Sequence, residues 1–188
     1  MRTFFAINLN HEIKKTLSLL IDELDKLDMG NKKIKWVKHE GMHLTLKFLG
    51  EIGREKVSHI ETALKRISEK FGPFVLEFKG TGYFPPGKKN PRVLWVGIEE
   101  EKILMALQAQ LEGEMEKLGF PRERWEFHPH LTLGRVKTFS SLSQTLLLLE
   151  KYREKNFGKM KVEKITFIQS TLKPTGAEYS VLSEIELK

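Results

Sequence analysis

Hydrophobic positions along the chain follow two spacings that alternate in a fixed order. A run of β-forming residues at 4–9 precedes a stretch with an apolar residue every three or four positions, which is typical of one helix face. A short strand-like run that contains Trp36 ends this pattern. The helical stripe consists of Ile13, Leu17, Leu20, Leu24 and Leu27. This part of the chain therefore predicts strand, helix and strand.

The same order returns in the second half of the sequence. Residues 92–98 are typical of a strand, residues 103–118 carry apolar positions at helical spacing, and residues 124–127 form a second strand-like run around a tryptophan. Each copy is followed by a strand that begins with His-Leu-Thr-Leu, at 43–46 and at 130–133. The chain thus repeats strand, helix, Trp-bearing strand and His strand.

A further amphipathic stripe follows each His-Leu-Thr-Leu strand, at 57–71 and at 142–152. Additional strands then close each half. We predict an α+β fold with two pseudo-symmetric lobes, each an antiparallel sheet with two helices. The lobes would flank a central cleft lined by the two His-x-Thr strands.

The proline- and glycine-containing segment 84–91 separates the two copies. We expect one bilobal domain over residues 1–188, with lobes at about 1–84 and 92–170 and a C-terminal strand at 177–187 that completes a sheet. A chain of 188 residues can bury a substantial core without covalent cross-links.

Composition excludes several kinds of chemistry. The chain has no cysteine, which rules out disulfides, thiol nucleophiles and cysteine-ligated zinc. No apolar run approaches the ~20 residues that a membrane span needs, and the N-terminus leads into a strand rather than a signal peptide. We therefore expect a cytoplasmic protein that does not bind membranes.

The formal net charge is +7, from 32 Lys and Arg residues against 25 Asp and Glu residues. This excess is compatible with binding a polyanion such as nucleic acid. Solvated helix faces explain it as well, because pairs such as Lys14-Lys15 and Lys65-Arg66 lie in predicted helices. Charge alone leaves both interpretations open.

The repeated tetrapeptide suits acid–base chemistry. Side chains alternate along a strand, so His43 and Thr45 share one face, as do His130 and Thr132, while the leucines face a core. Histidine has an unperturbed pKa of about 6.5, so two imidazoles in one cleft can accept and donate protons at the same pH. A nearby hydroxyl can donate to a phosphoryl oxygen as charge develops. One such motif is usually a plain strand; the duplication favours a site that acts on a phosphodiester.

Two residues near the motifs have open interpretations. Arg135 is out of phase with His130, so a bulge or the strand end must turn it if it is to bind phosphate. An exposed salt bridge explains Arg135 equally well. Lys47 is in phase with His43 and either adds positive potential to the groove or is solvated.

Other candidates are weaker. His128 and His130 could offer two imidazoles to a metal, but no third ligand has suitable spacing, so we predict no metal and no cofactor. Trp36 and Trp125 are expected to be core or rim aromatics, with base stacking as the minority alternative. The remaining histidines are expected at the surface.

Taken together, the motifs resemble the two-histidine phosphoesterase superfamily. Within it, the chain is most similar to the prokaryotic RNA 2′,3′-cyclic phosphodiesterases, also called 2′-5′ RNA ligases. The similarity covers nearly the whole length, includes Leu172-Lys173-Pro174 and Tyr179, and shows no departure at a motif position. The segments that carry it are Phe4-Phe5-Ala6-Ile7, Lys35-Trp36-Val37, His43-Leu44-Thr45-Leu46-Lys47-Phe48-Leu49-Gly50, Pro91-Arg92-Val93-Leu94-Trp95 and Pro129-His130-Leu131-Thr132-Leu133-Gly134-Arg135.

The resemblance implies a metal-independent enzyme that opens an RNA-terminal 2′,3′-cyclic phosphate to a 2′-phosphate. It also implies a reverse reaction that joins RNA ends through a 2′-5′ linkage. The substrates would include tRNA fragments, and the enzyme would be a monomer. Two alternatives stay open: a cyclic phosphodiesterase that acts on a small nucleotide, and a module that binds RNA or nucleotides without turnover.

The resemblance also assigns roles to individual residues. His43 would donate a proton to the departing 3′ oxygen, and His130 would accept the proton of the attacking water. Thr45 and Thr132 would hydrogen-bond the phosphate. Two further contacts are implied, from Arg135 to the phosphate and from Phe48 to the nucleoside. Which histidine is the acid and which the base comes from the family alone, because the two motifs are alike.

Overall fold

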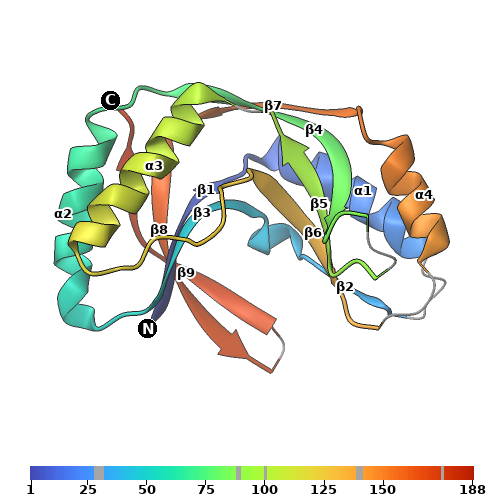
Figure 1. The fold of residues 1–188 in the computed structure, drawn as a ribbon, viewed down its shortest axis with the longest axis horizontal. Coiled ribbons are helices and arrows are strands. Elements are labelled where there is room, and N and C mark those ends of the chain that lie inside the picture. Colours follow the sequence, from blue (N-terminus) through green and yellow to red (C-terminus); the bar gives the residue numbers. More distant parts are fainter. Residues whose placement is uncertain (28–31, 88–89, 100, 139–141, 175) are drawn as a thin grey trace.

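Two antiparallel sheets face each other, and each is backed by two helices (Figure 1). The computed structural model describes residues 1–27, 32–87, 90–99, 101–138, 142–174 and 176–188. The first sheet has the order β3 (His43–Glu51), β1 (Arg2–Asn8), β8 (Lys164–Lys173) and β9 (Gly176–Glu186). The second has the order β2 (Ile34–Trp36), β6 (His130–Val136), β5 (Val93–Ile98), β4 (Phe74–Phe84) and β7 (Asn156–Val162).

The helices complete two layers outside the sheets. Helices α2 (Val57–Ser68) and α3 (Lys102–Lys117) pack together and against the first sheet. Helices α1 (His11–Leu27) and α4 (Ser143–Lys151) pack together and against β7 and β4 of the second sheet. The predicted α+β fold, with two lobes of one antiparallel sheet and two helices each, is confirmed.

The lobes are not successive segments of the chain, because the two halves of the sequence exchange elements. Strand β4 ends the first half and pairs with β5 of the second, while β8 comes from the second half and pairs with β1. Helix α1 follows β1 directly but lies against the other sheet. The segment at 84–91 therefore separates two copies of a sequence pattern and does not separate two lobes.

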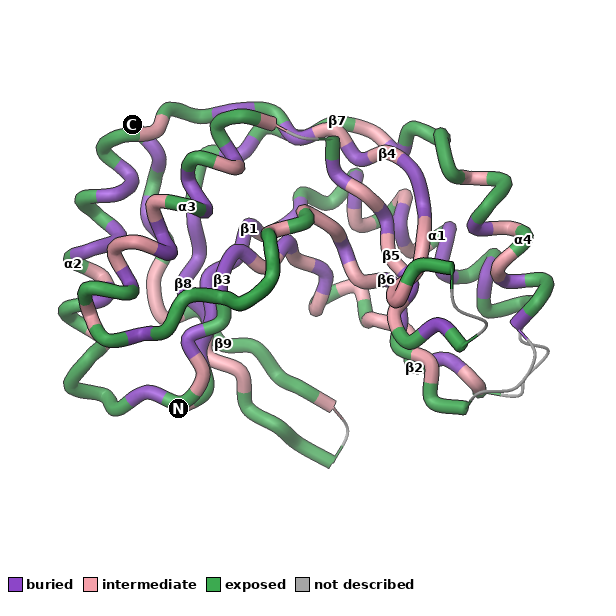
Figure 2. The backbone as a smooth tube through the Cα atoms, in the orientation of Figure 1, coloured by how far each residue is buried: buried purple, intermediate pink, exposed green. Residues whose placement is uncertain are grey.

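Alternation along the strands gives each sheet an inner and an outer face. Leu44 and Leu131 are buried on the faces that the helices cover, as predicted. The opposite face of the first sheet carries a small separate cluster of Phe4, Ala6 and Ile168. Buried positions follow the centres of both sheets, whereas the far end of the β8–β9 hairpin is exposed (Figure 2). The two uncovered sheet faces are left to form a cleft.

The second Trp-bearing strand predicted at 124–127 is absent. Trp36 lies on β2 and donates from Nε1 to Asp25 at 2.6 Å, but residues 124–127 form a loop in which Trp125 is 85% exposed. Prolines 121 and 129 flank this loop, and proline lacks the N–H that a strand ladder requires. The loop runs beside the edge strand β3 without pairing with it. Among the described helices, none is long and apolar enough to cross a membrane.

Candidate active site

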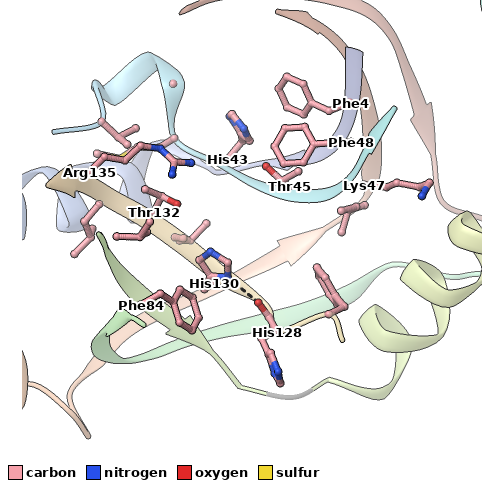
Figure 3. Close-up of a pocket in the computed structure, with 18 of the residues that line it drawn as sticks. Phe4, His43, Thr45, Lys47, Phe48, Phe84, His128, His130, Thr132 and Arg135 are labelled. Carbon is pink, nitrogen blue, oxygen red and sulfur yellow. Dashed lines mark hydrogen bonds between the residues drawn. The ribbon is translucent and has the colours of Figure 1, made fainter. Parts of the chain in front are cut away.

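The facing sheet surfaces enclose a cleft of about 1210 Å³, and the two histidine strands supply its centre. His43 and Thr45 of β3 line it together with His130 and Thr132 of β6 (Figure 3). Strands β3 and β6 belong to different sheets and contact each other across the cleft. The predicted cleft between the two His-x-Thr strands is therefore confirmed.

Each histidine strand contains a bulge at the same place in its motif. In β3, Thr45 pairs with Ala6 and Lys47 pairs with Phe5, so Leu46 is an extra residue. Before the bulge the even-numbered positions are buried, and after it Lys47 is buried while Phe48 is 52% exposed and lines the cleft. The bulge therefore places Phe48 on the same face as His43 and Thr45.

Strand β6 repeats this arrangement. Thr132 pairs with Trp95 and Gly134 pairs with Leu94, so Leu133 is the extra residue. Arg135 follows it on the exposed, cleft-lining side. A bulge was the condition under which Arg135 could join the histidine, and the structure has that bulge.

Lys47 borders the groove, but its ammonium group points away from it, contrary to both interpretations drawn from its phase. The bulge turns its side chain into the first lobe, where only 2% of the residue is exposed (Figure 3). Its Nζ donates to Glu112 Oε2 at 2.6 Å and to the Pro121 carbonyl at 3.0 Å. Glu112 also accepts from Gln108 Nε2 at 3.2 Å. Lys47 therefore ties the histidine strand β3 to α3 and to the loop that follows it.

The equivalent inward position in β6 is Gly134. A Cβ there would lie 2.6 Å from Ile34 Cγ2 and 2.7 Å from the Trp36 ring. In the first lobe Lys47 fills the space beneath the bulge. In the second lobe side chains of β2 fill the equivalent space. Only glycine fits at this approach of β2 to β6.

His43 lies between two aromatic rings. The ring centroids of Phe4 and Tyr179 are 4.8 and 5.1 Å from its own, and Tyr179 meets it edge-on. Burial lowers the pKa of His43 to about 4, and the positive charge of Lys14 acts in the same direction. A hydrogen bond to the backbone of Gly41 opposes this shift. In the free protein His43 is therefore neutral at neutral pH.

His130 has a related environment on the opposite side of the cleft. Phe84 meets its ring edge-on at 5.1 Å, and its Nδ1 lies 2.7 Å from the His128 carbonyl oxygen. A carbonyl only accepts, so Nδ1 carries the proton and Nε2 keeps its lone pair. Burial lowers the pKa of His130, the bond to His128 opposes this, and the charge of Arg135 lowers it further.

Groups that can receive an anion surround the histidines. The hydroxyls of Thr45 and Thr132 make no hydrogen bond to other residues in the described part of the chain. Arg2, Arg92 and Arg135 also line the cleft, and over the described ranges none of them is in an ion pair. The cleft therefore offers a phosphate two free hydroxyls and three arginines that have no ion-pair partner in the described ranges.

Within the described residues, no group of three or more His, Asp or Glu side chains could hold a metal ion. The second imidazole considered for a metal, that of His128, points away from His130 (Figure 3). The main contribution of His128 to the site is its backbone carbonyl.

Sequence reasoning missed several residues of the cleft wall. Neither the strand pattern nor the family resemblance assigns a site role to Phe4 or Phe84, although each ring packs against a motif histidine. Tyr179 was noted as part of the family resemblance without a role, and it touches His43 from the β8–β9 hairpin. For Phe4, a sequence signal was available. It lies on β1, the strand that pairs directly with the first histidine strand.

Comparison with known proteins gives consistent matches over the whole chain. The family model of LigT-like phosphoesterases matches residues 7–95 and again residues 96–179. A Thermotoga maritima protein named RNA 2′,3′-cyclic phosphodiesterase is 40% identical, over 100% of this chain and 96% of that relative. An Archaeoglobus fulgidus protein of the same name is 37% identical, over 99% of this chain and 100% of that relative.

Solved structures show the same fold. The crystal structure of a Thermus thermophilus protein superposes with a TM-score of 0.83, at 29% identity, over 100% of this chain and 98% of that one. Escherichia coli LigT in complex with 3′-AMP superposes with a TM-score of 0.79, at 24% identity, over 99% and 97% of the two chains. The two family-model matches also divide the chain close to where the sequence pattern repeats.

Proposed function

The chain belongs to the LigT-like phosphoesterases, and on this premise we propose that it hydrolyses RNA-terminal 2′,3′-cyclic phosphates to 2′-phosphomonoesters. Relatives at 37–40% identity over essentially the full length carry the name RNA 2′,3′-cyclic phosphodiesterase. The catalytic unit is the whole chain, residues 1–188, because each sheet takes strands from both halves.

One observation carries the proposal. Two histidines on facing strands line one cleft, and each ring is held by its surroundings, His43 between Phe4 and Tyr179 and His130 by the hydrogen bond to the His128 carbonyl. These contacts orient both rings. A pair of oriented imidazoles on opposite sides of a substrate is what simultaneous proton donation and acceptance requires.

In the proposed reaction, water attacks the phosphorus of the cyclic phosphate while His130 Nε2 takes the water proton. The bond from phosphorus to O3′ breaks, and His43 delivers a proton to that oxygen. The product is a 2′-phosphomonoester with a free 3′ hydroxyl. His130 ends protonated and His43 neutral, and exchange with solvent restores both. With a 5′ hydroxyl in place of water, the same ring opening gives a 2′-5′ linkage and a free 3′ hydroxyl.

The remaining cleft residues recognise the phosphate and the nucleoside. The free hydroxyls of Thr45 and Thr132 donate to the non-bridging phosphoryl oxygens, where negative charge builds during attack. Arg135 adds a forked, charge-assisted contact to the same phosphate. Phe48, which the bulge places beside Phe4 with ring centroids 5.7 Å apart, contacts the terminal nucleoside.

Substrate binding raises the pKa of the acid, and solvent supplies its proton. With a pKa of about 4, His43 is almost entirely neutral at pH 7 in the free protein. A bound phosphodiester brings a negative charge into the buried site, and an opposite charge within about 4–6 Å raises the pKa of a histidine. His43 therefore gains its proton as substrate binds.

We also propose that the enzyme is a monomer and that it works in the cytoplasm on RNA ends such as those of tRNA fragments. One chain supplies both histidines, both threonines and Arg135, so the site needs no second copy. Size-exclusion chromatography with light scattering measures the mass of the protein in solution and so tests whether it is a monomer. An RNA substrate favours a cytoplasmic location.

The test is an end-labelled oligoribonucleotide with a terminal 2′,3′-cyclic phosphate, incubated in the presence of EDTA. Conversion to a product that phosphorus NMR identifies as a 2′-phosphomonoester supports the proposal. A predominantly 3′-phosphate product would mean that the ribose binds the other way round, and that the acid and base roles assigned to His43 and His130 are wrong. Tight binding of the oligonucleotide without any product would favour a binding module instead.

A further inference from the structure

Trp125 lines the cleft and is nevertheless 85% exposed, the largest exposed fraction among the large hydrophobic residues described. It lies in the loop 118–129, which connects α3 to β6 and forms one wall of the cleft. Its counterpart in the first half, Trp36, is half-buried and hydrogen-bonded to Asp25. The indole of Trp125 therefore has both faces available, and no fold contact accounts for it.

The loop that carries Trp125 is anchored on both sides of the tryptophan. On one side, Lys47 Nζ holds the Pro121 carbonyl at 3.0 Å, and Glu112 Oε2 accepts from the Glu123 amide at 3.3 Å. On the other side, the Pro129 carbonyl accepts from the Ile98 amide at 3.3 Å. The loop backbone is thus held on both sides of the exposed indole, which lowers the conformational entropy that the loop would lose when the indole binds a ligand.

The size of the cleft leaves room beyond one nucleotide. Pockets that enclose a single small ligand typically measure roughly 300–1,000 Å³, and this cleft measures about 1210 Å³. Arg2 and Arg92 line the cleft without an ion-pair partner in the described part of the chain, but Arg92 lies at the Arg135 end of β6, and the cleft-lining neighbours of Trp125 are Glu123 and Glu126. The available space therefore suits a further nucleotide, and contact at Trp125 would come from base stacking rather than from phosphate binding.

We propose that Trp125 is a stacking platform for the base of a nucleotide upstream of the cyclic phosphate, so that the site selects RNA ends over cyclic mononucleotides. The inference rests on the proposed function, since it takes the terminal nucleotide to lie between His43 and His130. Trp125 precedes His130 by five residues, which span at most about 17 Å. One RNA strand can therefore contact the reacting histidine and the indole together.

Stacking explains why this position is a tryptophan that has no hydrogen-bond partner among the described residues. Every base presents a π face, so an aromatic platform binds RNA without reading its sequence. Loss of one such platform costs about 1–3 kcal/mol per base, which corresponds to roughly 5- to 150-fold in affinity. The expected selectivity is for the presence of an upstream nucleotide and not for its identity.

The experiment compares two substrates, 2′,3′-cyclic AMP and a five-nucleotide RNA with a 2′,3′-cyclic phosphate end. We expect Trp125→Ala to lower the ratio of kcat/KM for the RNA to kcat/KM for cyclic AMP by about tenfold, mainly through KM. Trp125→Phe should restore most of the ratio because it keeps a ring. The matched control is Leu147→Ala on α4, which removes an exposed apolar side chain outside the cleft and should leave the ratio unchanged.

A second readout does not depend on turnover. Titration with the same RNA bearing a 2′-phosphate should quench tryptophan fluorescence in the parent protein and not in Trp125→Phe. Equal losses on both substrates, an unchanged ratio in Trp125→Ala, or equal quenching in the two proteins would each overturn the proposal. Absence of hydrolysis of either substrate by the parent would count against the proposed function, while the quenching would still decide for or against the platform.

Discussion

Lys47 and Glu112 form an ion pair of 2.6 Å inside the first lobe, with the lysine side chain fully withdrawn from solvent. The pair lies one residue beyond the bulge in β3 and holds both α3 and the 118–129 loop. It therefore connects the strand of one histidine to the segment that leads into the strand of the other.

Removal of the lysine charge should destabilise the protein strongly. We expect Lys47→Met to lower the free energy of unfolding by about 3–5 kcal/mol, because it leaves the Glu112 carboxylate buried without its partner. The double variant Lys47→Met/Glu112→Gln removes both charges and should regain part of the loss. Urea unfolding measures both effects. Lys117→Met breaks an equally short but exposed pair with Glu114 and should cost much less.

Both motif histidines should be required for turnover. His43→Ala and His130→Ala each remove a proton-transfer group, which typically costs ~10²–10⁴-fold in rate. Initial rates on a cyclic-phosphate RNA end, with circular dichroism to verify folding, measure the effect. His59→Ala removes an exposed histidine on α2 and serves as the control. Turnover close to that of the parent by either motif variant would exclude the two-histidine mechanism.

Ligand binding should raise the pKa of His43 and thereby protonate its ring. In the free protein its imidazole should titrate at a pKa of about 4, because burial penalises the charged form. Binding of 2′-AMP places an anion in the site and should raise this pKa. NMR titration of the histidine ring protons, with and without 2′-AMP, tests the shift. If kcat depends on one neutral and one protonated histidine, its pH profile should be bell-shaped. A His43 pKa that stays unchanged on ligand binding would contradict the proposed source of the proton.

Arg135 should act on both the phosphate and His130. Arg135→Ala removes a donor to developing charge and should lower kcat/KM on the order of 10²-fold. It should also raise the pKa of His130, because one of the positive charges that lower it is lost. Arg135→Lys keeps the charge without the planar fork, so its kcat/KM should lie between those of the parent and of Arg135→Ala. Arg153→Ala, on a surface outside the cleft, is the control. If Arg135→Ala had the same kinetics as the parent, Arg135 would have no role in phosphate recognition.

Local patterns predicted the centre of the site because strand alternation needs no knowledge of the rest of the fold. His43, Thr45, His130 and Thr132 lie on the cleft face that the period of two predicts. The positions after the bulges could not be placed that way. An extra residue at Leu46 inverted the expected faces of Lys47 and Phe48, and nothing in the local sequence marks a bulge at a leucine.

The pairing of strands that are far apart in the sequence was the other feature that the sequence could not predict. The sequence repeat predicted two similar lobes, and it suggested that each copy forms its own lobe. Which sheet β4 and β8 join depends on contacts between residues far apart in the chain, such as Phe4 with Ile168, and period alone does not encode these. Analogy with Trp36 predicts a strand around Trp125, but the prolines on either side prevent a strand ladder there.

The exchange of strands between the two halves has a mechanical consequence. The backbone passes back and forth between the sheets, so the walls of the cleft are joined by peptide bonds at several points and not by one hinge. A cut at 84–91 would leave two fragments that each lack strands of both sheets, and neither could close its own hydrophobic core. The two lobes should therefore unfold in one cooperative transition, and a severed chain should regain its shape only when both fragments fold around each other.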